Sequence, residues 1–229
     1  EAHDTGDAGH ISISAHDISL LHHGLIVTDT SNIGNGGDIQ INATGMLTIA
    51  GTDEYGLKSA LNSAATSDDK NIVTGKAGTI SLQVNTLSID EGGEINTSTQ
   101  NARGGNIGMT IRNLLNLQQS QITTSVHGGQ GDGGNITIDN PQFVVMNWGQ
   151  IITQADAGHG GNIHIVTQHF LKTPDSLVSA SSRVGLDGKV QIESPDQSIS
   201  NSLLGSPKTF RDVRGLLPRP CESMSFEEF

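Results

Sequence analysis

Nine histidines are the residues of this 229-residue chain that most invite a chemical role. Five of them lie near the start and three later ones are spaced by five residues: His3, His10, His16, His22 and His23, then His159, His164 and His169. Zinc sites are usually built from close pairs such as Cys-x2-Cys or a helical His-x3-His, and neither spacing occurs here. We therefore predict surface histidines, no metal and no cofactor, with an adventitious metal contact as the alternative.

The glycine-rich segment 128–134 is a second candidate, with the sequence Gly-Gly-Gln-Gly-Asp-Gly-Gly. It resembles the calcium-binding turn Gly-Gly-x-Gly-x-Asp, but it is one residue short and occurs once, whereas such turns bind calcium when stacked in tandem. A dinucleotide loop of the Gly-x-Gly-x-x-Gly type would need a helix after it, and no helical pattern follows. The segment is predicted to be a corner of the chain without a ligand.

Paired carboxylates could cleave a polysaccharide, because glycosidases use two such groups on one face. Asp139 and Glu193 occupy equivalent places in the repeat described below, but two coils apart, at about 10 Å. The basic candidates Arg103 and Arg112 are isolated in the pattern. Aromatic side chains that could stack on a sugar are limited to Trp148 and Tyr55. We predict no catalytic residues, and keep a carbohydrate-active β-helix enzyme (a polysaccharide lyase or hydrolase) as the alternative.

A glycine-anchored repeat must position all of these groups. Its clearest copies read Gly-Gly-[Asn/Asp]-Ile-x-[Ile/Met] at residues 36–41, 104–109, 133–138 and 160–165, with degraded copies at 8–13, 77–82 and 187–192. The second position of each copy falls at residues 9, 37, 78, 105, 134, 161 and 188, so the period is about 27 residues with one gap of 41. A fixed period in this range indicates a solenoid.

The apolar pattern continues in register after each anchoring position. Offsets +2, +4, +9 and +17 are apolar, and offset +19 carries Thr28, Thr97, Thr124, Thr153 and Ala180. Apolar and polar residues alternate, which is typical of strands with one side inward. Gly and Asn punctuate these strands, since corners need the positive φ that they adopt cheaply. The sequence therefore predicts a parallel β-helix of about seven coils, with three short strands per coil and offsets +2, +4 and +17 buried.

Stacked coils would also align the residue after each anchoring position into a polar ladder. Its members are Asp38, Asn106, Asn135 and Asn162. We predict that these side chains satisfy one another's amides and that the ladder is structural, although such a row could resemble a ligand site. The same register places His10 at a turn and His164 on the outside.

The repeats define residues 1–194 as the solenoid and residues 195–229 as a cap followed by a partly disordered tail. Residues 198–204 could form a short strand or helix over the last coil, and an irregular tail is expected beyond residue 210. The long gap predicts an insertion at residues 53–76, a loop bulging from one coil. Insertions in solenoids often mark the binding face, although a plain exposed loop is the simpler interpretation.

Composition narrows the function classes. The net charge of −12 and pI of about 4.9 argue against nucleic acid and anionic membranes as partners. No apolar run is long enough for a membrane helix, so membrane insertion is not expected. Hydrophobic residues make up 34% and aromatic residues 3%, which suits the narrow aliphatic core of a β-helix. The single cysteine, Cys221, cannot form an internal disulfide.

Residues 133–221 resemble the C-terminal region of filamentous-haemagglutinin-type exoproteins of two-partner secretion. Segment 181–196, Ser-Ser-Arg-Val-Gly-Leu-Asp-Gly-Lys-Val-Gln-Ile-Glu-Ser-Pro-Asp, is similar to the family's closing segment, which precedes a proline-containing stretch and a late cysteine. Here these are residues 216–218, Leu-Leu-Pro, and Cys221. The resemblance implies a right-handed parallel β-helix that a partner transporter exports across the outer membrane. The family's N-terminal secretion domain has no counterpart in these residues.

The expected function is a non-enzymatic structural or adhesive segment of a large secreted or surface-attached exoprotein. The resemblance implies a role in adhesion, haemagglutination, aggregation or biofilm formation, an unidentified host or cell-surface ligand, and an extracellular or outer-membrane-associated location. Seven coils would span only roughly 35 Å. We therefore expect the chain to be the distal end of a longer shaft, with its N-terminal coil as an open edge.

Overall fold

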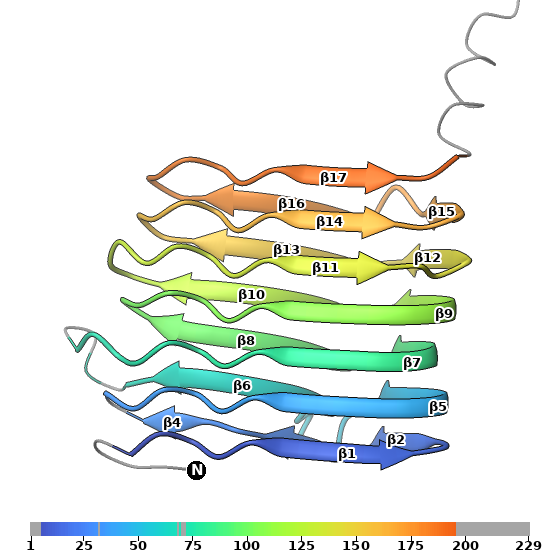
Figure 1. Ribbon diagram of the computed structural model, residues 1–229, viewed down its shortest axis with the longest axis horizontal. Coiled ribbons are helices and arrows are strands. Elements are labelled where there is room, and N and C mark those ends of the chain that lie inside the picture. Colours follow the sequence, from blue (N-terminus) through green and yellow to red (C-terminus); the bar gives the residue numbers. More distant parts are fainter. Residues whose placement is uncertain (1–5, 32, 68, 70–71, 196–229) are drawn as a thin grey trace, which may run out of the picture.

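The computed structural model describes residues 6–31, 33–67, 69 and 72–195, and it shows an all-β solenoid. The named strands pair in parallel, coil upon coil, and the described residues contain no helix. In Figure 1 the front strands run to the right and the rear strands run back to the left as the chain climbs from β1 (Ile11–Ala15) to β17 (Val190–Glu193), so the solenoid is right-handed. The predicted fold class is confirmed, with about six turns against the seven expected.

Each coil has three faces, of which the first two form one sheet. The first face stacks β1 (Ile11–Ala15), β5 (Ile39–Ala50), β7 (Ile80–Asp90), β9 (Ile107–Gln118), β11 (Ile136–Asp139), β14 (Ile163–Val166) and β17 (Val190–Glu193). The second face holds β2 (Ile18–Leu21), β12 (Phe143–Asn147) and β15 (His169–Lys172), with the later halves of β5, β7 and β9. In the middle coils one long strand therefore bends around the corner between the two faces, whereas in the outer coils each face has a separate strand.

The third face forms the other sheet. It stacks β3 (Leu25–Val27) with β4 (Thr30–Ser31), then β6 (Ala60–Thr66), β8 (Glu94–Gln100), β10 (Gln121–His127), β13 (Gln150–Ala155) and β16 (Leu177–Ser182). These strands run behind the first face in Figure 1. The two sheets enclose a core of aliphatic side chains and methionines, because the alternation turns every second residue inward.

The predicted inward offsets are correct. Ile136 and Ile138 in β11, Ile151 in β13 and Ile163 in β14 are at most 1% exposed. Offset +2 forms one continuous stack, in which Ile136 pairs with Ile107 on one side and Ile163 on the other. The end coils are less covered, so Ile26 and Val178 at offset +17 are only partly buried. Stability is therefore spread along the stack, with weaker coils at both ends.

Offset +9, by contrast, does not keep one orientation. Met46 and Phe143 at this offset are 44% and 39% exposed, while the next residues, Leu47 and Val144, are fully buried. The cause is the corner between the first two faces, which takes one residue more in some coils than in others. The pairing of β5 with β7 shifts register at this point, between Ala43 and Met46.

The insertion is not a single loop, so that interpretation of residues 53–76 was wrong. Residues 60–66 form β6, and Leu61 pairs with Ile26 below and Ile95 above. Leu61 follows its anchoring glycine by 24 residues, whereas Ile95 follows its own by 17. The extra residues are thus divided equally between a loop at 52–58 before β6 and a segment after it. The predicted cap at 198–204, the tail and Cys221 lie outside the described residues.

A buried hydrogen bond closes the corner between the third and first faces. The threonines at offset +19 donate to the carbonyl of the next anchoring glycine: Thr28 to Gly37 at 2.7 Å, Thr97 to Gly105 at 2.8 Å, Thr124 to Gly134 at 2.8 Å and Thr153 to Gly161 at 2.6 Å. Thr124 and Thr153 are fully buried. A Cβ on Gly134 would collide with the carbonyl oxygen of Gly105 in the coil below, so the anchoring position must be glycine.

Replacing Thr124 by Val should destabilise the chain by about 1–3 kcal/mol, because it leaves the buried Gly134 carbonyl without a donor while keeping the side-chain shape. Thr137→Val is the matched control, since Thr137 lies on the outer side of β11 and should change stability by less than about 0.5 kcal/mol. Urea unfolding of both variants measures the difference. Equal stability of the two variants would contradict the role assigned to the threonine.

Candidate functional site

The histidines are dispersed over the surface and do not converge. His164 Nε2 lies 3.1 Å from Glu193 Oε1, His23 Nδ1 lies 3.4 Å from Asp53 Oδ2, and the His169 ring stacks on Phe143 at 4.8 Å. Within the described residues no group of three or more His, Cys, Asp or Glu could hold a metal ion. His10 is exposed and His164 lies on the outer side of β14, as the register predicted. His3 lies outside the described part of the chain.

Asp132 lies at the centre of a charged cluster near the glycine-rich corner. Its Oδ1 accepts the backbone N–H of His159 at 3.0 Å and lies 3.3 Å from His159 Nδ1. Arg103 Nη2 lies 3.7 Å from Asp132 Oδ2, so the interpretation of Arg103 as isolated was wrong. The backbone N–H of His159, followed by the charges of His159 and Arg103, lowers the pKa of Asp132. The cluster therefore holds the Asp132 side chain in place as a carboxylate.

The segment at 128–134 is a corner, as predicted. Gly128 and Gly129 adopt φ of 73° and 58°, a conformation that glycine reaches at low cost. The Gly128 N–H donates to Asp156 Oδ2 at 2.7 Å, and Arg183 Nε donates to Asp156 Oδ1 at 3.2 Å. The Gly128 N–H, followed by Arg183, lowers the pKa of Asp156. Asp132 and Asp156 thus have cationic and N–H partners, which is the chemistry of an ion-paired corner.

Asp139 and Glu193 lie two coils apart, as the repeat predicted, because each pairs with Val166 from opposite sides. His164 and Gln191 both lie within hydrogen-bond distance of the Glu193 carboxylate. The side chain of His164, followed by that of Gln191, lowers the pKa of Glu193. Arg112 lies elsewhere and lines, with Gln83 and Thr110, a pocket on the first sheet.

The asparagine ladder is present, with a different partner from the one predicted. The Oδ1 of Asn106 accepts the backbone N–H of Asn135 at 2.9 Å, and the Oδ1 of Asn135 accepts that of Asn162 at 2.8 Å. In the same way the Oδ1 of Asp38 accepts the backbone N–H of Thr79 at 2.7 Å. The amide-to-amide contact from Asn162 Nδ2 to Asn135 Oδ1 is longer, at 3.3 Å. The ladder therefore satisfies the first N–H of each coil.

The corner between the second and third faces holds a column of residues in left-handed backbone conformation. The residues that precede them in the chain pair with one another from coil to coil, so the five occupy equivalent positions. They are His22, Gly51, Glu91, Gln119 and Trp148, with φ of 50°, 78°, 49°, 49° and 55°. Bulky residues rarely adopt this conformation. We refer to these five residues as the corner column.

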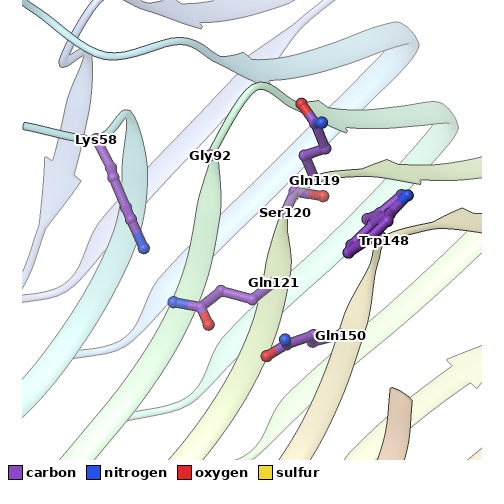
Figure 2. Close-up of a pocket in the computed structure, with 7 residues that line it drawn as sticks. All are labelled: Lys58, Gly92, Gln119, Ser120, Gln121, Trp148 and Gln150. Carbon is purple, nitrogen blue, oxygen red and sulfur yellow. The ribbon is translucent and has the colours of Figure 1, made fainter. Parts of the chain in front are cut away.

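A groove of about 340 Å³ lies beside the later part of this column, at Gln119 and Trp148, and we name it the corner groove. Its lining residues are Lys58, Gly92, Gln119, Ser120, Gln121, Trp148 and Gln150. Figure 2 shows Gln119 and Trp148 at the bend and the side chains of Lys58, Gln121 and Gln150 reaching into the same space. Trp148 is 58% exposed, and Lys58 lies 3.3 Å from Glu94 Oε2. The groove joins residues of several coils with the loop at 52–58.

Sequence reasoning missed this groove, although it noted Trp148 as a rare aromatic. The repeat does not reveal which residues take a left-handed conformation when the residue is neither Gly nor Asn. One signal was present, since Gly51 and Gly92 stand in the same corner of neighbouring coils. Aligning the coils on that corner would have placed Trp148 in register with Gly51.

No family model, no curated protein and no solved structure matches this chain. Among the described residues no helix is long and apolar enough to cross a membrane.

Replacing Asp132 by Asn should lower the melting temperature by a few degrees near neutral pH, and this difference should shrink on acidification. The pKa of Asp132 in the folded chain lies below its ordinary value of 3.8. Its contribution is therefore complete above that pH and is lost as the pH falls through the lowered value. The side chain is 41% exposed, so the effect should stay below about 1 kcal/mol.

Thermal unfolding of the two proteins at about pH 7 and about pH 2 measures the effect. Asp175→Asn, which removes an exposed carboxylate outside the cluster, is the control for net charge. A difference between wild type and Asp132→Asn that stays constant or widens at the lower pH would contradict the assigned role.

Proposed function

We propose that this chain is a non-enzymatic structural and adhesive segment of a secreted or surface-attached exoprotein. The supporting observation is the unbroken parallel stack from β1 to β17, in which the strands of each face lie coil upon coil. A solenoid of this kind is a rigid, extended scaffold, because each coil contacts only its neighbours. Such a scaffold displays surface groups along its length.

The outer side of the first face supports a display function. Its rows run across the coils at the strand spacing of about 4.8 Å. One row from β1 to β17 consists of Ser12, Gln40, Ser81, Gly108, Thr137, His164 and Gln191. Uncharged polar side chains dominate this straight row, and such a row gives a regular surface for weak contacts that add up over several coils.

The resemblance of residues 133–221 to filamentous-haemagglutinin-type exoproteins gives this scaffold a biological setting. We infer an extracellular or cell-surface location, export by an outer-membrane partner transporter through a domain outside this chain, and adhesion to a cell-surface ligand. The net charge of −12 disfavours anionic membranes and nucleic acids as that ligand.

Beads coated with the 229-residue chain should aggregate epithelial cells or erythrocytes above the level of albumin-coated beads. Excess soluble chain should block the aggregation, because free copies compete for the same ligand. Chain unfolded by heat before coating is the control for a requirement for the stacked coils. Microscopy or light scattering measures the aggregation.

Aggregation no greater than with albumin on either cell type would contradict adhesion. Release of reducing ends from polygalacturonate or cell-wall glycans by the purified chain would instead favour a carbohydrate-active enzyme. That activity would have to disappear on replacing an outward Asp or Glu, such as Asp139.

A further inference from the structure

We propose that the corner groove is a binding site for an uncharged oligosaccharide, with Trp148 as its stacking platform. The inference rests on the proposed adhesive function, to which it gives a ligand class. It is carried by the backbone conformation of Trp148, its exposure, and the amide groups beside it.

The backbone at Trp148 is the first observation. Its φ of 55° places an aromatic residue in the left-handed region, which costs conformational energy for any bulky side chain. Every residue of the corner column shares this conformation, so the bend imposes it on glycine at Gly51 and on larger residues such as Glu91 and Gln119 alike. Folding alone would be served better by Gly or Asn at position 148. Among the residues of the corner column Trp148 has the largest apolar side chain and lines the groove, so this choice at a strained position points to a role other than stability.

The exposure of Trp148 is the second observation. The core of the chain is aliphatic, and an indole could have been buried there. Instead Trp148 is 58% exposed and borders the groove (Figure 2). An indole has a wide apolar face and one N–H donor, so it suits a ligand that presents an apolar surface next to polar groups. The C–H face of a pyranose ring with its hydroxyl rim is such a ligand.

The neighbouring amides are the third observation. Gln119 and Gln150 are exposed and Gln121 is half-buried. The carboxamides of these three glutamines make no hydrogen bond with the described residues, and those of Gln121 and Gln150 reach into the groove in Figure 2. A carboxamide both donates and accepts, as a sugar hydroxyl does, so these two groups could bind hydroxyls of the ligand.

The charges favour a neutral ligand. Lys58 is the cation among the lining residues, and it is paired with Glu94 at 3.3 Å. Glu91 stands in the corner column beside the groove, and the chain carries a net charge of −12. These negative charges would repel a polyanionic glycan. Three strand spacings separate the coil of Gly51 from that of Trp148, roughly 14 Å, which suits a short oligosaccharide rather than a single sugar.

Trp148 is the only tryptophan in the chain, so its fluorescence reports on this groove alone. The probes are cellohexaose, maltohexaose, laminarihexaose and chitohexaose, with polygalacturonate oligomers as the acidic comparator. At least one neutral hexasaccharide should change the emission of the full chain saturably. Calorimetry should give the same affinity.

Trp148→Asn separates binding from stability, because Asn adopts positive φ readily. The variant should melt at the wild-type temperature or above it and bind the hexasaccharide at least about tenfold more weakly by calorimetry. Val184→Asn is the matched control, since Val184 is 67% exposed at a different corner, and should bind as wild type. A double replacement of Gln121 and Gln150 by Ala leaves the corner backbone intact and should also weaken binding.

Absence of binding by all four neutral probes would overturn the proposal, as would wild-type affinity in Trp148→Asn. Binding of the acidic oligomers alone would overturn it in favour of charge recognition.

The bead assay distinguishes the failure of the groove proposal from the failure of the adhesion proposal. Aggregation by wild type and Trp148→Asn alike, with no glycan binding, would reject the groove and leave adhesion standing. Glycan binding without aggregation would reject adhesion and leave the groove standing.

Discussion

The fold depends on the buried hydrogen bond between a threonine hydroxyl and the carbonyl of an anchoring glycine. At this corner the chain enters the next coil, and the glycine carbonyl turns into the narrow interior where no strand can donate to it. A buried carbonyl without a partner is costly, so an inward hydroxyl has to lie within reach. Thr97 and Thr153 do this from eight residues before their glycines. The carbonyl of Gly37, where the long coil begins, accepts two such bonds, one from Thr28 before it and one from Ser63 of the long coil.

The same corner explains why the anchoring residue is glycine and why the period is so regular. Gly161 lies against the carbonyl oxygen of Gly134, with no room for a Cβ. Close approach of the backbones brings the coils to strand spacing, and this spacing aligns the isoleucine stacks that fill the core. Polar ladders then complete the outer side, since Asn135 accepts the first N–H of the next coil. Within the described residues no buried side-chain polar atom lacks a partner.

Period and alternation were enough to predict the fold class and the burial of Ile136, Ile151 and Ile163, because these positions are constrained by every neighbouring coil. The corners were predicted less well. A corner can gain a residue without disturbing the strands, so Phe143 turned outward where Leu87 is buried. Likewise residues 60–66 form a strand of the third face although Leu61 lies farther from its anchoring glycine than in other coils. Leu61 still pairs with Ile26 and Ile95 in the neighbouring coils. Ion pairs such as Arg103 with Asp132 depend on side-chain reach, which the repeat does not encode.

The freedom of the corners also explains where a binding site can arise in such a chain. Inward positions are held by the core and outward strand positions by the row they belong to, so large changes are tolerated chiefly at the bends. The bend before the third face carries both the loop at 52–58 and Trp148, two departures from the repeat. A local sequence choice that opposes the backbone preference is expected where function, rather than folding, selects the residue. Trp148 is such a choice, and this is why the ligand site that we propose lies at the bend and not on the regular faces.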